Sequence, residues 1–268
     1  MPSRHRPFRL LAISDLATLS AGTGGGGAAG EWFAALAAAG VDGVQLREKH
    51  LDDLTLYERA RRARTTLPPP ALLLVNGRAD VALAAGADGV HLPADGVPAG
   101  ALRVRFGASL LIGVSTHRCE EVARAHRDGA DYVVFGPVYP MPSASGHGPP
   151  AGLEELARAC RLGIPVYALG RVTLERFAEI AAAGAAGVAG IRLFQSRSGP
   201  GSGPSSGPSS GPSSGEVAAR GKTGGREESG GSGGSGSDGS AGAVEGPADA
   251  GDVERCRQVV AAARACFG

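Results

Sequence analysis

Short apolar runs alternate along the chain with longer segments in which apolar residues recur every three or four positions. The short runs are typical of strands buried on both faces of a parallel sheet, and the longer segments are typical of amphipathic helices. We expect strands at about residues 8–14, 43–47, 71–76, 88–92, 110–115, 131–136, 165–169 and 186–191. Helices fit near 30–39, 53–66, 78–85, 98–106, 118–128, 151–161, 173–183 and 252–267.

A degenerate repeat marks four of the expected helix-to-strand junctions. It reads AAAGVDGVQL at 37–46, LAAGADGVHL at 83–92, HRDGADYVVF at 126–135 and AAAGAAGVAG at 181–190. Its glycines, Gly40, Gly86, Gly129 and Gly184, stand where helix C-caps are expected and lie 46, 43 and 55 residues apart. Each interval has room for one further helix, strand and helix. The eight units predict a single (β/α)₈ TIM barrel, although a doubly wound open sheet also fits the alternation.

Residues 196–250 differ in composition from the rest of the chain. Their 55 positions contain 17 Gly, 14 Ser and 5 Pro, and no aromatic residue. Such a segment buries too little apolar surface to offset the entropy of ordering it. We therefore expect a long disordered insertion between the eighth strand and the eighth helix, and a barrel built from residues 1–195 and 251–268.

Charge and apolar content exclude several classes of protein. Lys and Arg number 27 against 26 Asp and Glu, a balance that argues against a general nucleic-acid-binding protein. No apolar run approaches the roughly 20 residues of a membrane span, so no membrane partner is expected. The cysteines form no C-x-x-C pair and predict free thiols in the cytoplasm; they are Cys119, Cys160, Cys256 and Cys266. A homo-oligomer stays open.

Candidate chemistry lies at the carboxyl ends of the expected strands, where a barrel carries its functional groups. Gln45, Arg47 and Lys49 follow the second strand. Two cations and an amide suit a phosphate or diphosphate, although a solvated surface turn would have the same composition. The other polar or glycine strand ends are Asn76, His91, Ser115, Gly170 and Arg192.

Four motifs carry a resemblance to a known family. They are QLREK at 45–49, GVHL at 89–92, GVSTH at 113–117 and DYVVFGPVYP at 131–140. In order and spacing, the chain from about residue 9 to 194 resembles thiamine phosphate synthases and the related TenI-type thiazole tautomerases. The resemblance implies a TIM barrel. For a synthase it implies that a pyrimidine diphosphate loses Mg²⁺-bound pyrophosphate and that the nitrogen of a thiazole phosphate attacks the resulting cation.

The resemblance also assigns roles to particular residues. It implies catalytic roles for Arg47, Lys49, Ser115 and His117, the last matching the proton-transfer residue of the tautomerases. The implied contacts to the phosphorylated pyrimidine and thiazole are Gln45, Arg47, Lys49, Asn76, His91, Ser143, Gly170, Ile191 and Arg192.

Two departures from the family pattern bear on the mechanism. The usual Asn-Asp-Arg after the third strand is Asn76-Gly77-Arg78, which leaves Asp95 as the expected Mg²⁺ ligand. The loop after the sixth strand keeps Ser143 and lacks the usual lysine. Three functions therefore stay open: a thiamine phosphate synthase of weakened activity, a metal-free thiazole tautomerase, and a barrel that binds phosphorylated ligands without catalysis.

Overall fold

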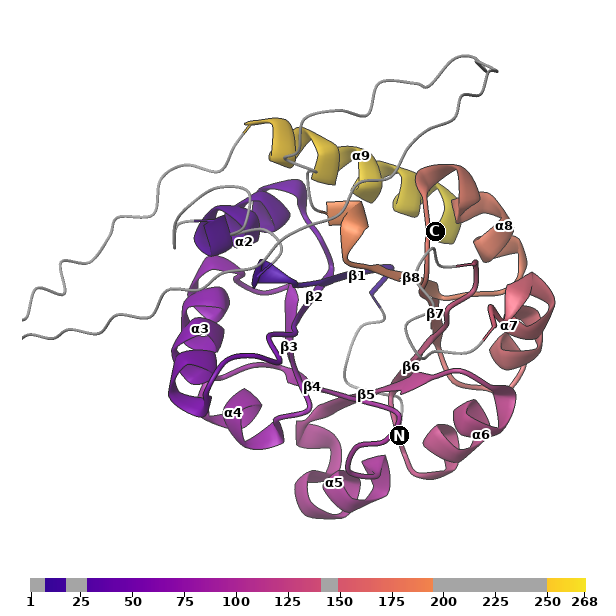
Figure 1. Cartoon of the computed structure of the whole chain (residues 1–268), viewed down its shortest axis with the longest axis horizontal. Coiled ribbons are helices and arrows are strands. Elements are labelled where there is room, and N and C mark those ends of the chain that lie inside the picture. The colour runs from indigo at the N-terminus through magenta and orange to yellow at the C-terminus, as the bar shows by residue number, and fades with distance from the viewer. Residues whose placement is uncertain (1–7, 18–27, 141–148, 195–249) are drawn as a thin grey trace, which may run out of the picture. The chain divides into compact units, whose positions relative to one another are not determined.

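The computed structural model of the chain describes residues 8–17, 28–140, 149–194 and 250–268. Its eight strands are parallel and form a closed barrel in chain order, in which β8 pairs with β1 (Figure 1). The closure confirms the predicted TIM barrel and excludes the open sheet. The strands are β1 (Leu10–Ile13), β2 (Gly43–Leu46), β3 (Leu72–Asn76), β4 (Gly89–Leu92), β5 (Leu111–Thr116), β6 (Tyr132–Phe135), β7 (Val166–Ala168) and β8 (Gly187–Gly190).

Helices surround the barrel as an outer ring (Figure 1). They are α2 (Ala28–Ala39), α3 (Asp53–Thr66), α4 (Ala79–Ala84), α5 (Ala99–Phe106), α6 (Cys119–Arg127), α7 (Gly152–Cys160), α8 (Phe177–Ala182) and α9 (Ala250–Phe267). The short 3₁₀ turns are η1 (Gly107–Ser109), η2 (Leu174–Arg176) and η3 (Arg192–Phe194). Because α9 contacts both α2 and α8, the last helix of the chain completes the ring.

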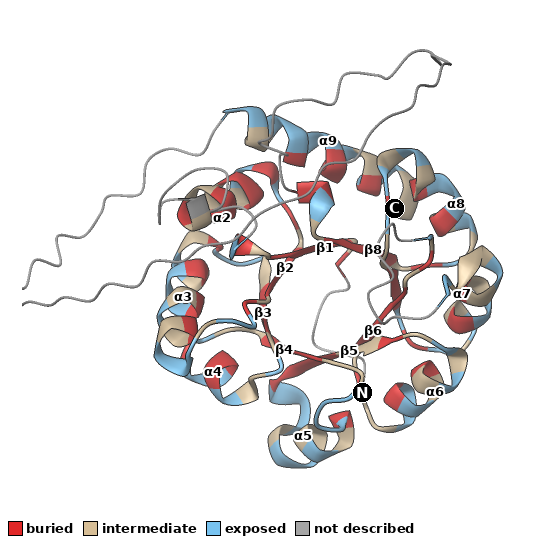
Figure 2. Cartoon of the chain, viewed as in Figure 1, coloured by how far each residue is buried: buried red, intermediate tan, exposed pale blue. Residues whose placement is uncertain are grey.

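Buried apolar residues form two clusters, one between the strands and the helices and one inside the barrel. Figure 2 shows buried positions along the strands and on the helix sides that face them. The inner cluster includes Phe8, Tyr132 and Tyr167, with the rings of Phe8 and Tyr167 stacked at 4.4 Å between centroids. Phe8 precedes β1, so these rings occupy the amino-terminal end of the barrel. The polar candidate residues lie at the opposite, carboxyl end of the barrel.

Some helices begin at other residues than the sequence predicted. Helix α9 begins at Ala250, the last residue of the predicted insertion and two residues before the predicted helix start. The 3₁₀ turn η2 delays α8 to Phe177. The other predicted insertion residues, 196–249, lie outside the described residues, as does Ser143. In the described ranges no helix combines the length and the apolar character needed to cross a membrane.

Candidate active site

Two amide side chains meet at the carboxyl ends of neighbouring strands. Gln45 lies in β2 beside Leu74 of β3, and Asn76 stands two residues further along β3. The Gln45 side chain is buried, and its Nε2 donates to Oδ1 of Asn76 at 3.3 Å. The pair forms a polar edge inside the barrel mouth, with donors and acceptors suited to the ring nitrogens of a heterocycle.

His91 lies inside the barrel between two hydroxyl groups. Its Nδ1 is 3.0 Å from the Tyr132 hydroxyl and its Nε2 is 2.9 Å from Oγ of Ser115. Burial, together with the nearby charge of Arg47, lowers the pKa of His91 to about 3. The imidazole is therefore neutral at physiological pH, and Ser115 lies on its side toward the mouth.

The segment after β2 is held by a buried carboxylate that the sequence did not single out. The Arg47 amide donates to Oγ of Ser14 at 2.8 Å, and this hydroxyl donates in turn to Glu48. The Leu16 amide also donates to Glu48, at 3.2 Å. Glu48 is 5% exposed. It ties the Arg47–Lys49 segment to the end of β1, so the turn is anchored and is not a loose solvated loop.

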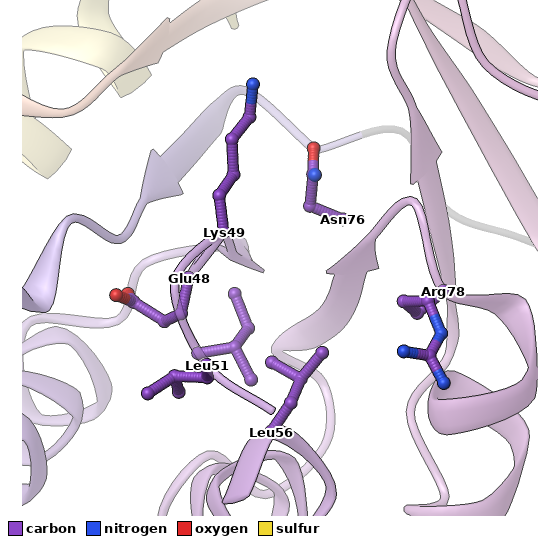
Figure 3. Close-up of a pocket in the computed structure, with 7 residues that line it drawn as sticks. Glu48, Lys49, Leu51, Leu56, Asn76 and Arg78 are labelled. Carbon is purple, nitrogen blue, oxygen red and sulfur yellow. The ribbon is translucent and has the colours of Figure 1, made fainter. Parts of the chain in front are cut away.

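A pocket of about 190 Å³ opens beside this turn (Figure 3). In Figure 3 the Lys49 and Asn76 side chains extend in the same direction, whereas the Glu48 carboxylate points away from them. The pocket is lined by Leu46, Glu48, Lys49, Leu51, Leu56, Asn76 and Arg78.

Arg78 contributes less positive charge to the pocket than its position suggests. Its guanidinium forms ion pairs with Asp53 and Asp80, and its Nη2 lies 2.7 Å from the latter carboxylate. The hydrogen bond from Arg78 lowers the pKa of Asp80 to about 2. Because Arg78 is bound to two carboxylates, Lys49 is the cation of the pocket lining that forms no ion pair among the described residues.

The described residues do not fit a magnesium site built from two carboxylates. Gly77 stands where the resemblance implies a carboxylate, and its φ of +70° is a left-handed conformation. Asp95, the expected ligand, is exposed. Within the described part of the chain, no group of three His, Cys, Asp or Glu side chains could hold a metal ion.

His117 follows β5 and is oriented by a carboxylate of α6. Oε2 of Glu121 accepts from the His117 amide at 2.7 Å and lies 3.3 Å from Nδ1 of its ring. The imidazole side chain is 33% exposed. A half-buried imidazole fixed by a carboxylate is a common arrangement for proton transfer.

The ends of β7 and β8 present backbone more than side chains. Gly170 has φ +103°, and a Cβ there would lie 2.7 Å from Cα of Pro137. Arg192 begins η3, and its exposed side chain follows Ile191. Arg255 of α9 donates to the carbonyl of Leu193 at 3.3 Å, which fastens η3 to the last helix.

The structure thus brings most of the predicted residues to one end of the barrel. Gln45 contacts Asn76, and His91 contacts Ser115 and lies near Arg47. His117 is held separately, by Glu121 of α6. The sequence analysis did not identify Ser14, Glu48 and Tyr132, which hydrogen-bond to site residues or to one another. Their position in or next to expected strands was the one feature of the sequence that pointed to them.

A closed parallel barrel with amide, imidazole, hydroxyl and cationic groups at its carboxyl mouth defines the class: a (β/α)₈ barrel suited to phosphorylated ligands. Residues 21–194 match the family described as thiamine monophosphate synthase. The chain belongs to this family.

Curated relatives and a solved structure agree with the assignment. The chain is 50% identical over 154 residues to a putative thiamine-phosphate synthase of Geobacter sulfurreducens, covering 57% of this chain and 72% of the relative. It is 42% identical over 167 residues to a thiamine-phosphate synthase of Gloeobacter violaceus, covering 61% and 48%. Thiamine phosphate pyrophosphorylase from Pyrococcus furiosus superposes with a TM-score of 0.61 at 29% identity, covering 71% of this chain and 88% of that one.

Proposed function

We propose that the chain is a thiamine phosphate synthase, which joins a hydroxymethylpyrimidine diphosphate to a thiazole phosphate and releases pyrophosphate. The observation that carries the proposal is that Arg47 and Ser115 both lie near buried His91. The Arg47 backbone is anchored to Ser14, and its charge reaches His91, whose other neighbour is Ser115. A cation and a hydroxyl that both lie near one imidazole at a barrel mouth suit a diphosphate.

In the proposed reaction the bond between the pyrimidine methylene carbon and the diphosphate oxygen breaks, and the electron pair leaves with the diphosphate. The thiazole nitrogen then donates its electron pair to the methylene cation, which forms the new C–N bond. Negative charge grows on the departing oxygen, so Arg47, Lys49 and the Ser115 hydroxyl would act by stabilising that charge. The Gln45–Asn76 pair would hold the pyrimidine ring through its nitrogens.

Thiamine phosphate synthases as a family use Mg²⁺. We assign no step here to the metal because Gly77 and exposed Asp95 do not form a two-carboxylate site. Loss of such a group typically costs a factor of about 10²–10³ in rate, so we propose weakened synthase activity.

A second candidate function, thiazole tautomerase, is supported by the His117–Glu121 pair. A tautomerase needs a phosphate contact and a residue that moves a proton, and it needs no metal. Glu121 holds the His117 imidazole through Nδ1 at 3.3 Å, and an imidazole oriented by a carboxylate is suited to moving a proton.

A direct assay distinguishes these functions. We expect thiamine phosphate to form from the two phosphorylated substrates, with Mg²⁺ present and absent, and Ser115→Ala to lower the rate. Calorimetry with the thiazole phosphate runs in parallel. A protein that isomerises thiazole and loses this activity in His117→Ala, without making thiamine phosphate, would be a tautomerase. Binding with neither activity would indicate a non-catalytic barrel.

The cytoplasmic location and a homo-oligomeric state stay predictions. The location is supported by the cysteines, all four of which are free thiols. Burial raises the pKa of Cys160 and of Cys256 to about 11, so these two are protonated and poorly reactive.

A further inference from the structure

Three polar side chains form a hydrogen-bonded chain through the barrel, from its apolar interior to its mouth. The Tyr132 hydroxyl lies 3.0 Å from Nδ1 of His91, and Nε2 of His91 lies 2.9 Å from Oγ of Ser115. The three residues come from β6, β4 and β5 respectively. Only Ser115 stands on the mouth side of the imidazole.

The strand register explains why two large rings can meet inside the barrel. His91 pairs with Gly113 of β5, and Gly113 pairs with Tyr132 of β6, so the three residues lie in one row. A Cβ at Gly113 would overlap the Tyr132 ring. Because Gly113 of β5 has no side chain, the Tyr132 phenol has the space to reach His91.

The ring of His91 is neutral, which restricts the hydrogen bonds it can make. The residue is 3% exposed and has the Arg47 charge near it, and these two effects lower its pKa to about 3. A neutral imidazole carries one proton, so one ring nitrogen donates and the other accepts. Donation along the three side chains therefore runs one way, either from Tyr132 toward Ser115 or from Ser115 toward Tyr132.

The Tyr132 hydroxyl decides that direction. Its side chain is 2% exposed and packs against the rings of Phe8 and Tyr167, with centroids 5.1 and 5.5 Å away. Burial raises the pKa of this phenol well above its ordinary value, so it keeps its proton. Among the described residues, Nδ1 of His91 is its one hydrogen-bond partner. A buried hydroxyl hydrogen without an acceptor is costly, so the phenol donates to Nδ1.

We propose that Tyr132 is a positioning residue that holds His91 in the Nε2–H tautomer and thereby makes Ser115 a hydrogen-bond donor to an anionic oxygen at the mouth. The Ser115 oxygen accepts from Nε2–H, and its own hydrogen is directed to the ligand. His91 cannot then take a proton from Ser115, which excludes Ser115 as a base-activated nucleophile. The ligand part of this inference rests on the proposed function, in which the anionic oxygen belongs to a diphosphate.

The tautomer can be measured without any ligand. In ¹⁵N-histidine-labelled protein at neutral pH, we expect the His91 signals, assigned by comparison with His91→Asn, to show a protonated Nε2 and an unprotonated Nδ1. Tyr132→Phe should release this preference and shift both signals. The matched control is Tyr167→Phe, because that buried phenol donates to the Phe8 carbonyl at 2.6 Å and not to His91. A protonated Nδ1 in the wild-type protein would overturn the inference.

The effect on the ligand is tested with inorganic pyrophosphate by calorimetry. We expect Ser115→Ala to weaken binding about 10- to 100-fold and Tyr132→Phe about 3- to 10-fold, with Tyr167→Phe unchanged. In the Ser115→Ala background, Tyr132→Phe should have no further effect, because its influence passes through the lost hydroxyl.

Equal weakening by Tyr132→Phe in both backgrounds would show a general packing role and overturn the inference. The predicted tautomer in a protein that does not bind pyrophosphate would support the hydrogen-bond direction and overturn the proposed diphosphate function. The two failures are therefore distinguishable.

Discussion

Arg47 and Lys49 differ in how firmly the structure holds them. The backbone of Arg47 is fixed through Ser14 to buried Glu48, whereas Lys49 is an exposed side chain at the pocket rim. Anchoring reduces the entropy that a cation loses when it binds a ligand. Arg47 should therefore contribute more than Lys49 to anion binding.

The first prediction follows from this difference. Arg47→Ala should weaken pyrophosphate binding by about 1.5–3 kcal/mol, because a charge-assisted hydrogen bond is lost, and Lys49→Ala should weaken it less. Arg124→Ala, which removes an exposed cation from α6, is the control. Calorimetry measures all three. Unchanged affinity in both site variants would indicate that the turn after β2 is a solvated surface turn without a binding role.

The second prediction concerns pH and stability. The pKa of His91 falls from 6.5 to about 3 on folding, so between these pH values the unfolded chain binds a proton that the folded protein does not. Stability is therefore lost as the pH falls through this window. From pH 7 to pH 4, guanidinium unfolding of the wild-type protein should lose about 3 kcal/mol more than that of His91→Asn. Parallel curves for the two proteins would contradict the buried neutral histidine.

The third prediction tests the missing carboxylate. Gly77→Asp has space, since the nearest atom to a Cβ there is 3.9 Å away, and Asp tolerates a φ of +70° better than most residues. It should raise the Mg²⁺-dependent rate of thiamine phosphate formation. Gly77→Asn is the control because it carries the same backbone strain without the charge. Equal rates in the two variants would argue against a metal role at this position.

At the residue scale, sequence reasoning found the groups that face the mouth and missed those that support them. Gln45, Asn76, His91 and Ser115 are polar residues in or at the ends of apolar strands, a pattern visible in the chain itself. Tyr132 reads as one more apolar strand residue, because only the pairing of β5 with β6 brings its hydroxyl to His91. Strands buried on both faces of a parallel sheet are near-continuous apolar runs, so their sequence does not mark which residues of neighbouring strands face each other.

At the element scale, helix ends were predicted best where a glycine marks them. Gly40, Gly86, Gly129 and Gly184 all have φ between +71° and +91°, as expected of glycines that end helices. The start of α8 was placed too early because η2 comes first, and 3₁₀ turns have no distinct hydrophobic period. Four of the strands followed from the repeat and the other four from the remaining short apolar runs, and the structure closes them into a barrel in chain order.

The fourth prediction belongs to the junction after β7. Gly170→Ala should destabilise the protein by roughly 2–4 kcal/mol, because its Cβ would lie 2.7 Å from Cα of Pro137 and its φ is +103°. Gly86→Ala is the matched control: φ is +71°, but no atom lies within 4 Å of the new Cβ. The control should lose about 1 kcal/mol in guanidinium unfolding. A similar loss in both variants would mean that backbone conformation alone, and not close packing, requires Gly170.

At the scale of the whole molecule, the fifth prediction is that the barrel does not need the long segment before α9. Deleting residues 197–249 should change the melting temperature by less than about 3 °C, since loop length affects stability only weakly. Val259→Asp is the contrast, because Val259 is 2% exposed in α9 and a buried charge should lower the melting temperature by about 10 °C. A deletion variant that fails to fold would show that the segment is part of the domain.

The late position of α9 in the chain also affects how the protein is made. The ribosome completes β8 and η3 55 residues before it reaches Ala250. At about 5–20 residues per second, that interval lasts roughly 3–11 s. During this time the nascent barrel lacks the helix whose buried residues face α2, α8 and η3. Synthesis therefore includes a period of several seconds in which a chaperone that binds apolar surface could act on a nearly complete barrel.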